Sequence, residues 1–223
     1  MPDELLDAIE IETGADPDAA VIWMHGLGDD GRGWSEVVPS LGLPPHLAIR
    51  FIFPHAPVMS VTINNGMRMR AWYDIRQANV NERADIAGVQ RSQAQVDALL
   101  AREAARGVTA NRTLLAGFSQ GGVIALHAGL RFPSRLAGIV ALSTYLVAPD
   151  QLSDQASAAN RDVPIFMAHG MLDPTISHAL GEMSRDYLAQ RGYAIDWHAY
   201  PMAHSVCAEE IADLRRWLSV RLR

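Results

Sequence analysis

The chain has 223 residues, of which 49% are hydrophobic and 20% charged, so it can bury a full core in a single globular domain spanning residues 1–223. Its net charge of −6 disfavours nucleic acid as the main partner. All 19 basic residues are arginine, which excludes a P-loop lysine, a Schiff-base lysine and a serine–lysine dyad. The single cysteine, Cys207, excludes an intramolecular disulfide and a cysteine-cluster zinc site.

The first half of the chain alternates strands with helices. Apolar runs predict strands at residues 8–12, at a sheet edge, and at 19–24 and 47–53. Helices are expected at 34–41, after the glycine-rich loop 25–31, and at 84–106, where Gly107 ends the helix. The turn Asn64-Asn65-Gly66 predicts a hairpin of residues 58–63 and 67–72 that lies over one end of the sheet.

The second half repeats the alternation. Strands are predicted at residues 113–118, 136–142, 163–168 and 194–200. Helices are predicted at 120–130, 177–191 and 208–222, with residues 151–160 either weakly helical or a loop. Regular alternation without repeats predicts an α/β fold with one mostly parallel, doubly wound sheet, whose ligands bind at the carboxyl ends of the strands.

No apolar run approaches the ~20 residues of a membrane-spanning helix. The N-terminal sequence MPDELLDAIE is acidic and lacks a signal-peptide pattern. We therefore expect a soluble, cytoplasmic protein without stable membrane insertion.

The segment Gly117-Phe118-Ser119-Gln120-Gly121 matches the G-x-S-x-G nucleophile elbow, in which a serine sits on a sharp turn between a strand and a helix. A strained turn leaves no room for side chains two residues before and after the nucleophile, which explains both glycines. The alternative is a plain glycine-rich turn with an incidental serine. The strand and helix on either side favour the elbow, with Ser119 as the nucleophile.

A serine nucleophile needs a general base, and the base needs a third group that fixes its tautomer. In an α/β-hydrolase the chain order is serine, acid, histidine. His204 follows the last predicted strand and is the best candidate base, with His198 and His178 as alternatives. Asp173 is the candidate acid because it alone follows a buried strand, on a tight loop before a proline; the alternative is an ordinary Asp-Pro turn.

The tetrahedral oxyanion needs two N–H donors. The backbone of Gln120, directly after the nucleophile, should supply one, and the backbone of Leu27 in the loop after the second strand should supply the other. Serine chemistry of this kind requires no cofactor and no metal.

Other residues allow two interpretations each. Cys207 could be a reactive thiol near the base, although a small packed residue is the simpler interpretation. The hairpin residues Met59, Met67, Met69 and Trp72 could form an acyl groove or simply pack in the core. Arg68, Arg70 and Arg76 are expected on a solvated face.

Six motifs together resemble the acyl-protein thioesterase and bacterial carboxylesterase family. They are His25-Gly26-Leu27-Gly28-Asp29, Pro54-His55-Ala56-Pro57, Ala71-Trp72-Tyr73-Asp74-Ile75, Gly117-Phe118-Ser119-Gln120-Gly121-Gly122, His169-Gly170 with Asp173-Pro174, and Met202-Ala203-His204-Ser205-Val206. The resemblance implies an α/β-hydrolase with little cap domain, with its triad at Ser119, Asp173 and His204 and its oxyanion donors at Leu27 and Gln120. It also implies frequent homodimers.

We therefore expect a serine hydrolase that cleaves carboxylic esters of short to medium acyl chains through an acyl-enzyme. Thioesters of the same chains are a further expected substrate. Small-molecule or lipid esters and acylated proteins are the expected partners. The alternatives are a lysophospholipase, a protein S-deacylase, or a hydrolase-fold binding protein without activity. Trp72, Leu146 and Ile176 are expected to line the acyl groove. The chain differs from many relatives at Thr175-Ile176-Ser177, where they carry two valines, and at Ala203, where they have glycine.

Overall fold

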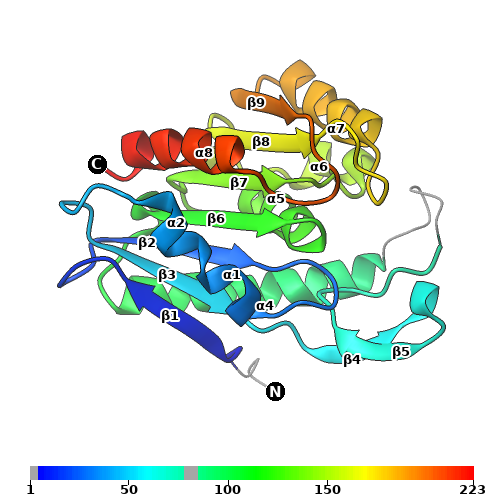
Figure 1. The fold of residues 1–223 in the computed structure, drawn as a ribbon, viewed down its shortest axis with the longest axis horizontal. Coiled ribbons are helices and arrows are strands. Elements are labelled where there is room, and N and C mark those ends of the chain that lie inside the picture. The colour runs from blue at the N-terminus through cyan, green and yellow to red at the C-terminus, as the bar shows by residue number, and fades with distance from the viewer. Residues whose placement is uncertain (1–4, 78–84) are drawn as a thin grey trace.

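A seven-stranded sheet forms the centre of the computed structural model, which describes residues 5–77 and 85–223 (Figure 1). The strand order is β1-β3-β2-β6-β7-β8-β9, and only the edge strand β1 runs antiparallel to its neighbour. The strands are β1 (Ala8–Glu12), β2 (Ala19–Met24), β3 (Ile49–Pro54), β6 (Thr113–Phe118), β7 (Gly138–Leu142), β8 (Ile165–Gly170) and β9 (Ile195–Tyr200). The expected mostly parallel, doubly wound sheet is confirmed.

Helices cover both faces of this sheet (Figure 1). One face carries α1 (Gly31–Ser35), α2 (Val37–Leu41) and α8 (Ala208–Arg221). The other carries α4 (Ile86–Ala105), α5 (Gln120–Arg131), α6 (Pro149–Gln155) and α7 (His178–Gln190). Alternation along each strand supplies both cores: in β2, Val21 and Trp23 pack with the α8 side, whereas Ile22 and Met24 pack with the α5 side.

The prediction of a single helix over residues 34–41 is wrong, because two short helices, α1 and α2, occupy this stretch. The first begins earlier, since the Asp30 side chain accepts hydrogen bonds from the backbone N–H groups of Arg32 and Gly33. It ends at Ser35, four residues before Pro39. Proline has no N–H for the Ser35 carbonyl, and its ring would clash with that carbonyl in a continuous helix.

The predicted hairpin forms a separate two-stranded sheet of β4 (Val58–Val61) and β5 (Met67–Arg70). Both strands are shorter than predicted, and β4 ends at Val61 because residues Thr62–Asn64 form a 3₁₀ turn. The Asp74 carboxylate fixes this turn by accepting hydrogen bonds from the backbone N–H and the hydroxyl of Thr62, at 2.7 and 2.6 Å.

Two further boundaries can be compared with the sequence. The long helix α4 starts at Ile86; Ala84, where its start was predicted, lies outside the described residues. Within residues 151–160 the structure has the end of α6 and a 3₁₀ turn, Ala158–Asn160.

The six parallel strands end at one edge of the sheet, on the right in Figure 1. The loops that follow β2, β6, β8 and β9 therefore meet there. Among residues 5–77 and 85–223, no helix has both the length and the apolar character needed to cross a bilayer.

Candidate active site

Ser119 lies between β6 and α5 with φ 54° and ψ −119°, a conformation that L-residues rarely adopt. Its neighbours hold it there: the Ser119 N–H donates to the Leu142 carbonyl at 2.8 Å, and the Thr144 hydroxyl donates to the Ser119 carbonyl at 2.7 Å. The flanking glycines are required by space. A Cβ on Gly121 would lie 2.2 Å from the Met24 oxygen, and one on Gly117 would lie 2.3 Å from the Gly121 backbone.

The structure brings Ser119, His204 and Asp173 together in one hydrogen-bonded chain. His204 Nε2 lies 2.9 Å from Ser119 Oγ, and His204 Nδ1 lies 2.6 Å from Asp173 Oδ2. The three residues come from the loops after β6, β9 and β8. Phe118 packs against the His204 ring, with centroids 4.7 Å apart, and so restricts the orientation of the imidazole.

Donors surround the Asp173 carboxylate, whose side chain is fully buried. Its Oδ1 accepts hydrogen bonds from the backbone N–H groups of Thr175 and Ile176, at 2.8 and 2.9 Å. Its Oδ2 faces His204 and also lies 3.4 Å from Nε2 of His169. These hydrogen bonds hold the carboxylate in place with Oδ2 directed at His204.

The loop after β2 passes beside Ser119, and the His25 side chain fixes it through hydrogen bonds. The Ala56 N–H donates to His25 Nε2 at 3.1 Å, so Nδ1 carries the proton and donates to the Gly26 carbonyl at 2.7 Å. Burial lowers the pKa of His25, which keeps this ring neutral. In the described part of the chain the Leu27 N–H has no hydrogen-bond acceptor.

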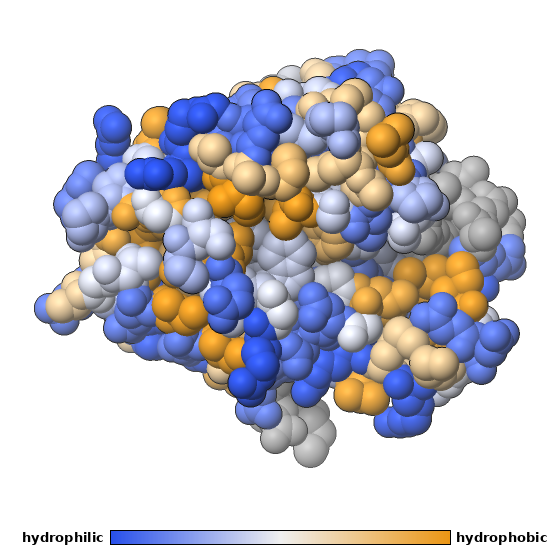
Figure 2. Space-filling model, viewed as in Figure 1, coloured by the Kyte–Doolittle hydropathy of each residue, from blue (hydrophilic) through white to orange (hydrophobic). Residues whose placement is uncertain are grey.

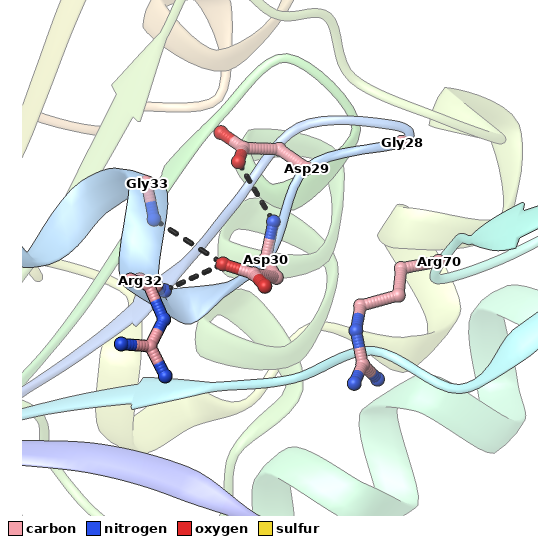
Figure 3. Close-up of a pocket in the computed structure, with 6 residues that line it drawn as sticks. All are labelled: Gly28, Asp29, Asp30, Arg32, Gly33 and Arg70. Carbon is pink, nitrogen blue, oxygen red and sulfur yellow. Dashed lines mark hydrogen bonds between the residues drawn. The ribbon is translucent and has the colours of Figure 1, made fainter.

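A pocket of about 430 Å³ opens directly beyond this loop (Figure 3). It is lined by Gly28, Asp29, Asp30, Arg32, Gly33 and Arg70. Arg70 is not a purely solvated residue, as the sequence suggested: it is half-buried, its guanidinium donates to the Ala56 carbonyl, and its own carbonyl accepts from the Gly28 N–H at 2.9 Å. Strand β5 therefore supports the loop that carries Leu27.

The Gln120 side chain has a role that the sequence analysis missed. Its Oε1 accepts from the Trp72 N–H at 2.8 Å, and its Nε2 donates to the Tyr73 carbonyl at 2.7 Å. The Trp72 indole N–H in turn donates to the His25 carbonyl at 2.9 Å. Residues 72–73 are thus tied both to the elbow and to the loop after β2. The only sequence signal for these hydrogen bonds was the glutamine directly after the elbow serine.

The three residues expected at an acyl groove lie in different surroundings. Leu146 lines a mostly apolar cavity of about 720 Å³ between the loop before α6 and helix α7. Trp72 is 1% exposed and is held by the hydrogen bonds just described, and Ile176 is buried in the turn after Asp173; neither lines this cavity. Tyr145, Leu180 and Met183 line it instead, and the sequence analysis did not single them out.

The hairpin methionines are not core residues in the ordinary sense. Met67 is 63% exposed, and Val58 and Ile63 are also exposed. Figure 2 shows hydrophobic residues, in orange, among polar ones on the surface over the hairpin, at the lower right. Met69 is half-buried, with its sulfur near Gly28.

The alternative bases and the cysteine lie in other surroundings. His198 on β9 pairs with Asp196 at 3.0 Å, and His178 at the start of α7 lies 3.4 Å from Glu182. Cys207 is a free, half-buried thiol at the N-cap of α8. In the ranges that the structure covers, no cluster of three or more His, Cys, Asp or Glu side chains could hold a metal ion.

Comparison with known proteins gives consistent relatives. The profile of the phospholipase/carboxylesterase family matches residues 6–222. Acyl-protein thioesterase 1 of Yarrowia lipolytica is 39% identical over 97% of both chains, and that of Neurospora crassa is 41% identical over 92% of this chain and 87% of the relative. Among solved structures, Arabidopsis thaliana SOBER1 has a TM-score of 0.86 at 28% identity, covering 92% of this chain and 99% of that one. Zea mays acyl-protein thioesterase 2 has a TM-score of 0.85 at 28% identity, covering 97% and 99%.

Proposed function

Since the chain belongs to the phospholipase/carboxylesterase family and is a serine hydrolase of esters and thioesters, we propose that Ser119, His204 and Asp173 are its catalytic triad. The observation that supports these roles is the unbroken chain of hydrogen bonds from Ser119 Oγ through His204 to Asp173. The proposed catalytic unit is a single α/β-hydrolase domain covering residues 1–223.

In the first half-reaction Ser119 Oγ attacks the acyl carbonyl carbon, and His204 Nε2 takes the hydroxyl proton. The negative charge of Asp173 stabilises the imidazolium and holds Nδ1 in its protonated form. When the tetrahedral intermediate collapses, His204 gives the proton to the leaving oxygen or sulfur, and the acyl group remains on Ser119 as an ester. A water molecule then attacks this ester with His204 as its base, which releases the carboxylic acid and restores the serine.

The oxyanion of each tetrahedral intermediate is proposed to accept hydrogen bonds from the backbone N–H groups of Leu27 and Gln120. Two features support this assignment: the Leu27 N–H has no acceptor among the described residues, and Gln120 opens helix α5, whose N-terminal end carries partial positive charge. Removal of one such donor typically costs about 3 kcal/mol of barrier.

The proposed acyl site is the 720 Å³ cavity beside Leu146, because its lining is mainly apolar and it lies at the same edge of the sheet as Ser119. Short to medium acyl chains are the proposed substrates. Acylated proteins are a second candidate substrate class, favoured by the relatives named acyl-protein thioesterase 1 at 39% and 41% identity. Lysophospholipids are a third, favoured by the phospholipase in the family description. Cytoplasmic location and a homodimer stay predictions.

Hydrolysis of p-nitrophenyl butyrate tests the catalytic assignment. We expect activity in the wild type, loss of at least about 10³-fold in Ser119→Ala, and full activity in Ser205→Ala, an exposed serine next to the base. A fluorophosphonate probe should label the wild type and not Ser119→Ala. Equal hydrolysis by wild type and Ser119→Ala would refute the assignment, and an unlabelled, inactive wild type would favour a binding protein.

Hydrolysis rates measured against acyl length, for matched oxygen esters and thioesters, distinguish the substrate classes. A preference for short and medium chains supports the cavity as proposed. Faster cleavage of a long-chain S-acylated peptide than of the free thioester would assign protein deacylation, and faster cleavage of a lysophospholipid would assign lipid hydrolysis.

A further inference from the structure

A second histidine, His169, lies behind the acid of the triad. It is the fifth of the six residues of β8 and is 1% exposed. Its Nε2 lies 2.9 Å from the Ile176 carbonyl and 3.4 Å from Asp173 Oδ2. Both neighbours are acceptors, so Nε2 must carry a hydrogen. The mechanism described above does not use this side chain.

Contacts on every side fix the His169 ring. Its plane stacks on Trp197 of β9, with centroids 6.4 Å apart, and its edge faces the His178 ring of α7 at 5.9 Å. Gly181 of α7 lies directly against Nδ1, where a Cβ would approach to 2.4 Å. The imidazole is thus held in one orientation, with its Nε2–H aimed at the turn that carries Asp173.

The hydrogen bonds of this turn connect His169 to the acid. The Ile176 N–H donates to Asp173 Oδ1 at 2.9 Å, while the Ile176 carbonyl accepts from His169. Ile176 is therefore held through both its donor and its acceptor. If the Nε2–H were lost, a buried carbonyl would have no partner, and the turn would be free to rotate the carboxylate away from His204.

The charge state of His169 suits this role. Desolvation by burial lowers its pKa, against the opposing effects of the Ile176 carbonyl and the Asp173 carboxylate. The other titratable groups facing it are His178 and His204, and His178 is itself paired with Glu182. At neutral pH the ring is uncharged, so it donates a hydrogen bond without adding a positive charge that would compete with His204 for Asp173.

We propose that His169 is a positioning residue that holds the turn 173–176, and with it the Asp173 carboxylate, in the orientation that His204 requires. This inference rests on the triad proposed above. It assigns His169 no contact with substrate; its effect passes entirely through Ile176 and Asp173.

A pair of amide variants tests the proposal, because only one of them restores the donor. In His169→Gln the amide nitrogen can reach the place of Nε2, whereas in His169→Asn it reaches only as far as Nδ1. We expect His169→Asn to lower kcat by about 10- to 100-fold with KM within about twofold, and His169→Gln to retain activity within about threefold of wild type. His198→Gln, which replaces the histidine of β9 that pairs with Asp196 and stacks on Phe166, is the matched control and should keep wild-type kcat.

The pH profile separates positioning from a general loss of structure. Without the His169 donor, the Asp173 carboxylate turns away from His204 and stabilises the protonated imidazole less, so the acid limb of kcat/KM should move to lower pH in His169→Asn and return in His169→Gln. Equal kcat in His169→Asn and wild type, or equal losses in the Asn and Gln variants with an unmoved acid limb, would overturn the proposal. His169→Phe provides a second variant without a donor if the Asn variant unfolds.

Fluorophosphonate labelling of the same proteins separates this inference from the triad assignment. If the wild type does not react at Ser119, the triad assignment fails. If the wild type reacts and a folded His169→Asn reacts at the same rate, only the role of His169 fails. Slower but complete labelling of His169→Asn is the expected result.

Discussion

Ser119, the residue proposed to attack the substrate, has a strained backbone conformation. Its φ of 54° and ψ of −119° place the side chain on a turn where Cβ crowds the backbone. The strain is held by hydrogen bonds to Leu142 and Thr144 and by the absence of side chains at Gly117 and Gly121. The consequence is a hydroxyl that projects above the sheet edge, within reach of His204.

This strain predicts an inverted order of stability at position 119. A glycine at this position relieves the strain, although it loses more chain entropy on folding than alanine does. We expect Ser119→Gly to be more stable than Ser119→Ala by about 1 kcal/mol, with both inactive. Chemical denaturation of the two variants measures the difference.

The exposed helical residue Ser153 of α6 is the control for this comparison. There glycine should be less stable than alanine by about 0.5–1 kcal/mol, the usual order. If glycine were also the less stable choice at position 119, the elbow would not be strained.

The triad could be predicted from the sequence because each member follows a predicted strand in a fixed chain order. His169 could not, since it lies inside β8 and its role depends on Ile176, seven residues later, folding back onto the ring. The Gln120 side chain was missed for a similar reason. Its partners are the backbone groups of Trp72 and Tyr73, and backbone partners leave no pattern in a sequence.

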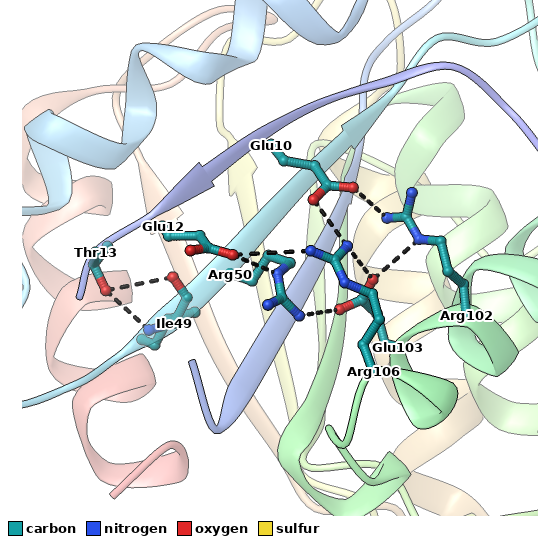
Figure 4. Close-up of polar contacts among 8 residues, drawn as sticks. All are labelled: Glu10, Glu12, Thr13, Ile49, Arg50, Arg102, Glu103 and Arg106. Atoms are coloured by element: carbon teal, nitrogen blue, oxygen red, sulfur yellow. Dashed lines mark hydrogen bonds and ion pairs between the residues drawn. The ribbon is translucent and has the colours of Figure 1, made fainter. Parts of the chain in front are cut away.

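At the level of elements, a buried ion network joins the edge strand β1 to β3 and α4 (Figure 4). Glu103 of α4 is fully buried and pairs with Arg50 of β3 at 2.8 Å and with Arg102 and Arg106 at 3.1 Å. Arg50 and Arg106 also pair with Glu12 and Glu10 on β1, each at 2.8 Å. Three arginines, from β3 and from the C-terminal end of α4, thus pair with a single carboxylate without contact to water.

Glu103→Gln removes the negative charge and leaves the Arg50 guanidinium, 7% exposed, with Glu12 alone. We expect a loss of about 3 kcal/mol in the free energy of unfolding, because the buried Arg50 charge then keeps only the exposed Glu12 carboxylate as its partner. Urea unfolding of both proteins at low and high salt checks this, and the loss should persist in high salt since the pair is shielded from ions.

Two further variants show whether burial is the cause. Glu12→Gln affects a carboxylate whose side chain is 42% exposed and should cost less than about 1 kcal/mol. Replacing both partners, Arg50→Met with Glu103→Leu, should cost less than Glu103→Gln alone. A Glu103→Gln variant as stable as Glu12→Gln would contradict the assignment of the network as a buried one.

Element boundaries show which parts of the fold the sequence determines locally. Strand and helix order followed from apolar runs and glycine ends, because those signals lie within each segment. The break in the helix at residues 31–41 depended on Pro39 acting on the Ser35 carbonyl. The short β4 depended on Asp74, twelve residues beyond Thr62, capturing its N–H. The network around Glu103 brings together residues up to 96 positions apart, which no local pattern can reveal.

For the whole molecule, a buried acid sets how stability depends on pH. Glu210, in the first turn of α8, is fully buried, and burial raises its pKa to about 8 from 4.5. The folded chain therefore binds a proton here between pH 4.5 and 8 that the unfolded chain has released. Stability from this group is complete below pH 4.5 and is lost as pH rises toward 8.

Other buried groups act at lower pH. Burial lowers the pKa of His127 to about 3, so its contribution is complete above pH 6.5 and is lost as the pH falls from 6.5 toward 3. Burial raises the pKa of Asp97 to about 6, so the stability that this group contributes is lost as the pH rises to about 6 and changes little at higher pH. Between pH 6.5 and 8 the change in stability should therefore come mainly from Glu210.

Glu210→Gln tests this directly, since the amide keeps the shape of the protonated acid but cannot ionise. Wild type should lose about 1.5 kcal/mol of unfolding free energy between pH 6.5 and 8, and Glu210→Gln should lose much less, so that the variant is the more stable protein at pH 8. Denaturant titrations at several pH values measure both slopes, and Glu209→Gln, the exposed neighbour in the same helical turn, should follow the wild type. Parallel slopes for wild type and Glu210→Gln would mean that Glu210 is already ionised in the fold. Because Glu210 lies in the first turn of α8, the loss of stability at high pH should also appear as reduced protection of backbone amides in α8, measured by hydrogen exchange.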